Sequence, residues 1–339
     1  MIKDKINSPF AEGNAVLRSK INSFSFRKIS FEIVEHYYEC EITHKEFTNS
    51  ELDYLNLIQV YNQYRDKYGL PFPGQIRSIR EKYGLSARKM SEILGLGANS
   101  YRLYEKGEVP SIGNGRLILA AEDPGEFKKF LVASEDVINP RELEKINERV
   151  KEIIHSEQDL NYSNLIKERI FSLLVPDHTT GYRLPILEKI THLILYFSER
   201  TQTWKTKLNK LLFYSDFLSF KHYGSGISGL DYRAINMGPV PANFDKIYEL
   251  VCEGESLKKE YIEYTNGYYG ELFLPLETFN KALFDESELE VMEVVSEKFK
   301  NKKTEEIIRI SHQEPAWKEN ISEKRIISYK DFAFTLKAL

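Results

Sequence analysis

The sequence predicts a mainly helical α+β protein built from several parts, and three observations predict this class. The chain has 339 residues, enough for two domains and a small third one. Apolar residues recur at helical spacing behind capping residues over most of the chain. Alternating stretches rich in β-branched and aromatic residues are short, and the longest covers residues 26–47. We therefore expect a few short strands among many helices.

Composition narrows the class further without naming a function. Hydrophobic residues make up 42% of the chain and charged residues 29%, as in ordinary globular proteins. The net charge is −4, so any case for nucleic-acid binding has to be made for single regions. The N-terminal sequence is too polar for a signal peptide, and no run of about 18 apolar residues predicts a membrane span.

Only two cysteines occur, Cys40 and Cys252, and they lie far apart in the sequence. This number excludes a disulfide framework and every four-cysteine zinc site, and it suits a reducing cytosol. The seven histidines are scattered and form no metal-binding or catalytic pattern. We expect a cytoplasmic protein that holds no metal and no cofactor.

Residues 1–70 predict an arm, a small β element and one helix. The first 25 residues are polar and without period, so we expect them to be loosely ordered. Residues 26–47 predict two or three short strands. Asn49 or Ser50 can cap the helix that follows, which is expected to end at Gly69.

Residues 71–133 predict a compact domain of short helices. The first helix is expected at 75–83, and Ser86 can cap a second one. Glycines within residues 95–97 make a tight turn into a third helix at 98–105. Two short helices joined in this way predict a helix-turn-helix module.

The exposed face of the third helix carries polar and guanidinium groups that can reach base edges in a major groove. Between residues 71 and 120 eight basic residues stand against four acidic ones, so this region is locally basic. Arg88 and Lys89 begin the second helix, where we expect phosphate contacts. A three-helix module with a solvated polar face is the alternative. The candidate DNA-binding residues are Arg88, Lys89, Ala98, Asn99, Ser100 and Arg102.

The segment GLSARKMSEILGLGANSYRLYEKGEVPS resembles the Xre/Cro-type helix-turn-helix family, including its closing Tyr-Glu-x-Gly. The longer stretch 26–127 is similar to MqsA/YgiT-type antitoxins, which join a zinc ribbon to such a DNA reader. Cys40 stands alone where the ribbon has two Cys-x-x-Cys pairs, so we expect a metal-free, ribbon-like β element. Ala87 stands where the family usually has glutamine, so either the preferred DNA site differs or the affinity is weak.

Residues 134–180 predict a helical connector. Asn139 can cap a helix that has Pro140 at its first position, and a second helical pattern covers 163–175. The apolar positions of the first helix form one narrow stripe on a charged rod, which can be a dimer seam or a spacer. The stripe consists of Leu143, Ile146, Val150, Ile153 and Ile154.

Residues 181–339 are denser in apolar and aromatic residues and predict several helices with a small β part. A hairpin is expected to turn at Asn266-Gly267, a strong signal for a tight turn. The glycine-rich stretch 223–229 follows a helix and lacks a Lys-Ser/Thr end, so it predicts a flexible connection and not a phosphate cradle. Asp216 or His222 with Asp231 could be imagined as acid–base pairs, but surface or capping roles are favoured, and we assign no catalytic residue.

Three separated motifs in this region resemble the Panacea domain, also called SocA-like. They are Lys-Leu-x-Lys-Leu-Leu-x-Tyr at 207–214, Gly-Pro-Val at 238–240 and Ser-His-x-x-x-x-Trp within 307–319. The resemblance covers about 185–335. It implies a largely helical, non-enzymatic domain of antitoxins that neutralise small toxins by direct binding, or of adaptors that present a toxin for proteolysis.

A toxin-binding surface needs exposed anchors on a rigid scaffold. The stretch that runs into the Gly-Pro turn supplies the candidates, and a strand buried in the domain core is the alternative interpretation. We expect His312 and Trp317 to brace the fold. The candidate toxin-binding residues are Tyr232, Arg233, Asn236, Gly238 and Pro239.

Taken together, the sequence predicts an antitoxin of a type II toxin–antitoxin system. Its C-terminal domain would bind a small protein toxin, and its helix-turn-helix would bind promoter DNA as a homodimer, since one module reads only a half-site. The alternative is a transcriptional regulator or proteolytic adaptor with no cognate toxin. An enzyme is disfavoured because no convergent catalytic set is visible.

Overall fold

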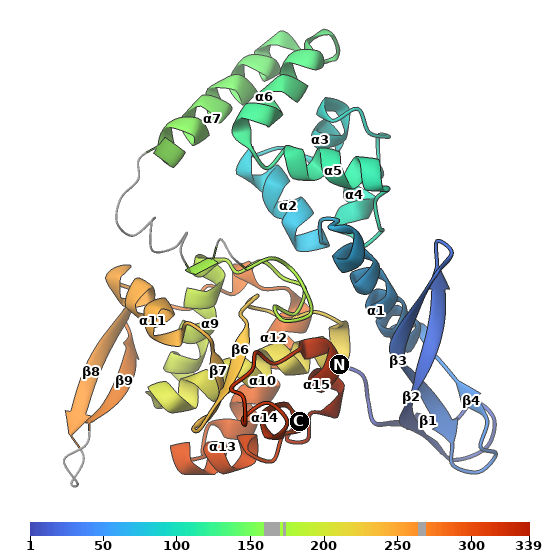
Figure 1. Ribbon diagram of the computed structural model, residues 1–339, viewed down its shortest axis with the longest axis vertical. Helices are drawn as coiled ribbons and strands as arrows, with labels where there is room; N and C mark the ends of the chain where they lie inside the picture. Colours follow the sequence, from blue (N-terminus) through green and yellow to red (C-terminus); the bar gives the residue numbers. More distant parts are fainter. Residues whose placement is uncertain (159–169, 172–173, 264–268) are drawn as a thin grey trace. The chain divides into compact units, whose positions relative to one another are not determined.

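The computed structural model describes residues 1–158, 170–171, 174–263 and 269–339. The fold is mainly helical with small sheets, which confirms the predicted class (Figure 1). Contacts divide the chain into two units. The first comprises Met1–Ser25, Ser30–Gln59 and Ile166–Leu339, and the second comprises Phe26–Ile29 and Val60–Leu165. The segment expected to be one N-terminal part, 1–70, is therefore shared between the two units.

A four-stranded sheet opens the chain in the order β1-β2-β3-β4. Its strands are β1 (Lys5–Asn7), β2 (Asn14–Phe26), β3 (Ile29–Cys40) and β4 (Glu46–Phe47). The expectation of a loosely ordered arm over residues 1–25 is wrong, because β1 and β2 lie there. Ala15 is the one buried residue of β2, so the strand shows too little apolar alternation to be recognised from its sequence.

The tip of the β2–β3 hairpin belongs to the second unit. Arg27 and Lys28 both take positive φ, at 48° and 67°, as a two-residue primed turn requires. This conformation is strained for residues other than glycine. The Arg27 guanidinium donates hydrogen bonds to the carbonyls of Val109 at 2.7 Å and Pro110 at 2.9 Å, which stabilises the turn.

Helix α1 (Ser50–Tyr68) follows the sheet and is capped by Asn49, whose Oδ1 accepts from the Leu52 amide. Two side-chain amides of α1 form hydrogen bonds with the backbone of β3, as the backbone of a neighbouring strand would. Asn56 exchanges two hydrogen bonds with the His36 backbone, at 2.8 and 2.9 Å, and Gln59 exchanges two with Val34, at 3.1 and 2.9 Å. These pairs satisfy buried backbone groups and fix α1 on the sheet.

The second unit is a bundle of short helices around one apolar core. The predicted cap is confirmed, since Ser86 Oγ accepts from the Lys89 amide at 3.2 Å. Tyr101 is fully buried and donates its hydroxyl to the Ile76 carbonyl at 2.7 Å, which anchors α4 on α2. The helices are α2 (Pro73–Lys82), α3 (Ala87–Ile93), α4 (Ser100–Glu105), α5 (Ile112–Ala120), α6 (Pro124–Ala133), the 3-10 turn η1 (Glu135–Val137) and α7 (Pro140–Gln158).

The apolar stripe of α7 packs into this core. Ile146, Val150 and Ile153 are buried, and Leu143 and Ile154 pack against the same cluster. The stripe is covered within one chain, which argues against its use as a dimer seam. The second connector pattern, 163–175, lies largely outside the described residues.

The C-terminal part of the first unit is built around α10 (Lys205–Tyr223), in which every residue from Lys207 to Phe220 is buried. Strands β8 and β9 pair antiparallel as expected, while the turn at Asn266-Gly267 lies outside the described residues. No helix in the described ranges is long and apolar enough to cross a bilayer. The other elements are α9 (Leu187–Arg200), β5 (Thr203–Trp204), β6 (Tyr232–Ile235), β7 (Gly238–Pro241), α11 (Phe244–Glu253), β8 (Leu257–Glu263), β9 (Tyr269–Pro275), η2 (Lys281–Leu283), α12 (Glu286–Phe299), α13 (Thr304–Ser311), α14 (Pro315–Lys318), α15 (Tyr329–Phe332) and η3 (Ala333–Thr335).

The burial of the α7 stripe makes a prediction. Val150→Ala should lower the free energy of unfolding of the second unit by about 2 kcal/mol, because it removes two methyl groups from a closed core. Glu148→Ala, at an exposed position of the same helix, should change it by less than about 0.5 kcal/mol. Denaturant unfolding and light scattering check this. A loss of dimer mass in Val150→Ala without a loss of stability would contradict the packing described here.

Candidate functional site

Helix α10 carries polar side chains where solvent hardly reaches, and each of them needs an internal partner. The partners come from several neighbouring elements, so the polar groups tie α10 to its surroundings. These buried polar residues are Lys207, Asn209, Lys210, Ser215, Asp216 and Ser219. Two of them hold the segments next to β6: Lys210 holds β7, and Asp216 holds the loop before β6.

Lys210 is fully buried and donates its Nζ to the Pro239 carbonyl at 2.9 Å. Burial lowers the pKa of Lys210 from its usual 10.5 to about 7. The folded pKa lies below the unfolded one, so the folded state gains stability from this group as pH rises from about 7 towards 10.5. The bond fixes β7 (Gly238–Pro241) on α10.

Gly238 lies against the same lysine with φ at +97°, in the left-handed region. A Cβ placed there would meet Ser311 Oγ at 2.5 Å and Lys210 Cε at 2.6 Å. Only glycine therefore fits between α10 and α13 at this turn. The Gly-Pro turn and the lysine of α10 form one packed unit.

His312 and Trp317 support the other strand of the hairpin. Their rings stack with centroids 3.9 Å apart and an interplanar angle of 12°. Trp317 Nε1 donates to the Ile235 carbonyl at 2.8 Å, at the end of β6. The expected bracing role of both residues agrees with these contacts.

Glu314 connects α10 to the last residues of the chain. It is 1% exposed, and its Oε1 accepts from the Tyr214 hydroxyl at 3.2 Å. The amides of Lys337 and Ala338 also donate to its carboxylate, at 2.8 and 3.0 Å. The three motif segments, 207–214, 238–240 and 307–319, thus converge on the β6–β7 hairpin.

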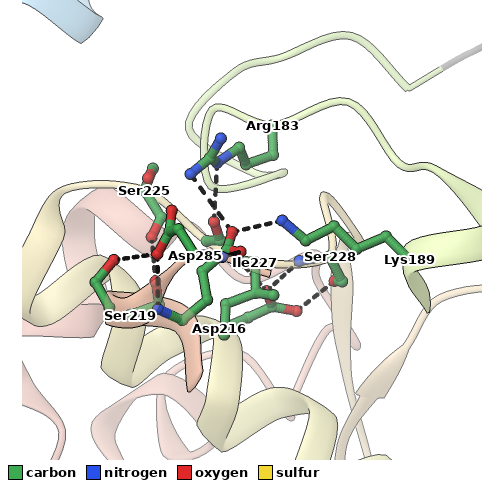
Figure 2. A network of polar contacts seen from close by, with 11 residues as sticks. Arg183, Lys189, Asp216, Ser219, Ser225, Ile227, Ser228 and Asp285 are labelled. Atoms are coloured by element: carbon green, nitrogen blue, oxygen red, sulfur yellow. Dashed lines mark hydrogen bonds and ion pairs between the residues drawn. The ribbon is translucent and has the colours of Figure 1, made fainter. Parts of the chain in front are cut away.

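The glycine-rich loop after α10 is held by Asp216, which belongs to the polar network in Figure 2. Its Oδ1 accepts from the amides of Ile227 at 2.7 Å and Ser228 at 2.8 Å. Its Oδ2 accepts from the hydroxyls of Ser228 at 2.5 Å and Tyr232 at 2.7 Å. Burial raises the pKa of Asp216, while these donors lower it.

Further contacts fix the same loop from two sides. Arg183 Nε donates to the Gly226 carbonyl at 3.1 Å, and Ser219 Oγ donates to the Ser225 carbonyl at 2.8 Å (Figure 2). A Cβ on Gly224 would lie 2.5 Å from Ile58 Cγ2. The expectation of a flexible connection over 223–229 is wrong, because buried hydrogen bonds and close packing order this loop.

The candidate toxin-binding residues divide into two groups. Tyr232 is fully buried and donates its hydroxyl to Asp216, and Gly238 and Pro239 are also buried. These three residues therefore hold the hairpin in place and are not part of its exposed surface. Arg233 and Asn236 are exposed. This corrects the expectation that all five residues form a contact surface. Alternation along β6 turns Tyr232 inward, and Gly238 and Pro239 of β7 lie against Lys210.

The sequence reasoning missed Met237, which is 48% exposed at the hairpin turn between Asn236 and Gly238. A large apolar side chain at a tight turn is a usable signal, since methionine is enriched in protein interfaces. The exposed part of the hairpin, called the hairpin tip below, consists of Arg233, Asn236 and Met237.

The candidate DNA-binding residues lie in the second unit, on α3 and around the start of α4. Ala98, Asn99 and Arg102 are exposed, and Arg102 donates to Asn99 Oδ1 at 3.3 Å. Ser100 is half-buried at the first position of α4. These four residues, at and just before the start of α4, therefore lie together at the surface of the second unit.

Arg88 and Lys89 differ in their freedom to meet a phosphate. The Arg88 side chain is 82% exposed, with Glu92 Oε1 3.4 Å away. Lys89 Nζ lies 2.6 Å from Glu92 and 2.9 Å from Glu142 of α7, and these carboxylates raise its pKa. The amine of Lys89 is therefore already neutralised by two carboxylates of its own unit, whereas the guanidinium of Arg88 is exposed to solvent.

Comparison with known proteins finds a similarity in the C-terminal region. Residues 208–318 match the family described as Antitoxin SocA-like, Panacea domain. The match covers less than half of the chain and includes most of α10, the β6–β7 hairpin, α13, and the stacked rings of His312 after α13 and Trp317 in α14. No family match supports the predicted MqsA-like or helix-turn-helix region. No curated protein and no solved structure matches the chain.

The packing at the hairpin makes a prediction. Gly238→Ala should lower the free energy of unfolding of the first unit by about 3 kcal/mol, because a Cβ there has neither space nor a favourable φ. Gly254→Ala is the matched control, since its nearest neighbour would be an ordinary 3.5 Å away. Thermal unfolding of both variants checks this. Equal midpoints for the two variants would refute the close packing of Gly238 on Lys210.

Proposed function

We propose that this protein is an antitoxin that neutralises a small protein toxin by direct binding through the hairpin tip. The observation that carries the proposal is the convergence of the matched SocA-like segment on this one hairpin. A buried lysine, a Trp–His stack and an ordered loop support the hairpin from below. The chain would act by fitting surfaces together, without chemical turnover.

The chemistry of the hairpin tip fits protein recognition. Arginine and methionine are enriched at interfaces, and Asn236 adds a side chain that both donates and accepts. The support below holds these groups in one arrangement before binding, so little conformational entropy is lost on association. Tyr232 contributes by holding β6 through Asp216, without touching the partner.

The proposal predicts the effect of removing the hairpin tip. A triple variant of the full chain combines Arg233→Ala, Asn236→Ala and Met237→Ala. It should bind a small toxin encoded by the adjacent gene about 100-fold more weakly, as expected for loss of interface hot spots. Glu249→Ala with Glu253→Ala, at exposed positions of α11, is the control and should bind normally. Calorimetry and rescue of growth measure the two effects. Equal binding by both variants would overturn the assignment of the hairpin tip.

The full chain is the proper material for this test. The first unit includes residues from both ends of the sequence, and His36 packs on Phe334 with ring centroids 4.8 Å apart. Ile58 of α1 also fills the space beside Gly224. A fragment of residues 181–339 would lose these contacts, so its failure would not bear on binding.

The second part of the proposal is that the second unit binds promoter DNA as a helix-turn-helix. Its support is the pair α3 and α4 with an accessible polar side, and the exposed Arg88 at the start of α3. A palindromic operator would take two copies, one for each half-site. The commitment of Lys89 to Glu92 and Glu142 leaves Arg88 as the stronger phosphate contact of the two.

DNA binding yields a prediction with two separable readouts. Arg88→Ala should weaken binding to every duplex and reduce the salt slope by about 1, because one phosphate contact is lost. Asn99→Ala with Arg102→Ala should mainly relax sequence preference, since these groups would reach base edges. Titrations of the protein's own promoter and a scrambled duplex, at several salt concentrations, measure both. If the wild-type chain does not distinguish the two duplexes, the DNA part of the proposal fails.

A further inference from the structure

A groove of about 920 Å³ lies beside the hairpin tip within the first unit. It is formed where the starts of α10 and α13, the end of α12 and the start of β9 meet. Met237 of the hairpin tip is part of its lining. The groove is therefore continuous with the surface proposed to bind a toxin.

The lining is strongly basic, with five lysines, Lys205, Lys207, Lys300, Lys302 and Lys303, against a single acidic residue, Glu305. Two of these lysines form ion pairs with carboxylates that do not line the groove. Lys205 pairs with Glu271 and with Asp245, and Lys300 pairs with Glu297. The remaining three determine the charge that a ligand meets.

Those three lysines have no carboxylate within ion-pair distance among the residues that the structure describes. Lys302 and Lys303 stand in the turn between α12 and α13. Lys207 is 4% exposed, and its Nζ donates to Thr201 Oγ1 at 2.8 Å and to the Lys300 carbonyl at 3.1 Å, two neutral acceptors. Burial lowers the pKa of Lys207 and the charge of Glu306 opposes this, and Glu306 also interacts electrostatically with Lys302 and Lys303. The remaining excess of lysines over carboxylates favours an anionic ligand.

One wall of the groove is an open sheet edge. The short strand β5 pairs with β9 only at Phe273 and Leu272. Strand β9 continues through 269–271, where it pairs with β8 on its other side. On the β5 side this part of β9 has no strand partner in the described ranges, and its Tyr269 and Gly270 line the groove.

An open edge next to an excess of lysines defines the shape and charge of a ligand. We propose that the groove binds an extended acidic segment of the toxin, which adds as a strand along residues 269–271 of β9. Carboxylates on this segment meet Lys302 and Lys303. Strand addition supplies main-chain hydrogen bonds, and the lysines supply the preference for acidic side chains. This inference rests on the proposed antitoxin function.

A peptide fits this groove better than a nucleic acid does. A nucleic acid has no backbone that pairs with a strand edge. The carboxylate of Glu305 lies in the same lining, and it would repel a continuous phosphate chain while leaving room for separate side-chain charges. The exposed Met237 and Tyr269 add apolar contact at the rim.

Peptide binding to the full-length protein tests the groove without knowledge of the toxin. The probe is a ten-residue peptide of alternating glutamate and valine, measured by fluorescence anisotropy. Binding should become at least tenfold weaker in Lys302→Glu with Lys303→Glu, and stay unchanged in the control Lys246→Glu with Lys281→Glu. Both control positions are exposed and outside the lining.

Two further probes separate strand addition from plain charge attraction. The same peptide with N-methyl groups on alternate residues keeps its charge but loses main-chain donors, and it should bind at least tenfold more weakly. Equal binding of the methylated peptide would overturn strand addition. Preferential binding of a ten-residue thymidine oligonucleotide would overturn the choice of a peptide.

The toxin itself then distinguishes the two proposals. If the toxin binds the Lys302→Glu, Lys303→Glu variant as tightly as the wild type but fails to bind the hairpin-tip variant, the groove proposal is overturned and the antitoxin function stands. If the toxin fails to bind the wild-type chain, both are overturned. Weaker toxin binding by each variant, with normal binding by the controls, supports both.

Discussion

The hydrogen bond from Lys210 to the Pro239 carbonyl is the contact on which the C-terminal architecture depends. A lysine at 0% exposure is costly to keep charged, and burial accordingly lowers its pKa to about 7. The side chain lies where α10, β7 and α13 meet, against a glycine that leaves no room for a Cβ. Together with the bond from Trp317 to the Ile235 carbonyl, this donor holds the hairpin tip in place, and with it the Met237 side of the groove.

The same arrangement explains why the matched family motifs are separated in sequence. The lysine helix, the Gly-Pro turn and the Trp-containing segment supply the donor, the acceptor and the outer support of one hairpin. Their chemistry is structural. The neighbouring exposed residues Arg233, Asn236 and Met237 are the groups that the proposed binding would use.

Sequence reasoning succeeded where a signal is local. The caps at Asn49 and Ser86, the paired strands β8 and β9 and the helical character of the chain follow from spacing and capping residues. It failed for β2, whose residues are almost all solvated and carry no alternation. It also treated 223–229 as flexible, because the buried carboxylate that orders this loop lies on the preceding helix and gives no signal in the loop itself.

The candidate site was only partly predictable for the same reason. Alternation along β6 could have assigned Tyr232 inward and Arg233 outward, but the direction of the strand is set by its tertiary contacts. The lysine groove draws its residues from four distant segments, and only the cluster at 300–303 is visible in the sequence. The narrow apolar stripe of α7 left two uses open, and packing against the core of its own unit decides between them.

The titration of Lys210 tests the central claim most directly. NMR of the full chain with ¹³C-labelled lysine follows each ε-carbon against pH, and Lys210→Met identifies the signal. The structure predicts a pKa of about 7 for this lysine, well below its usual 10.5. A value near 10.5 for Lys210 would mean that its amine reaches water, and the supported hairpin described here would be incorrect.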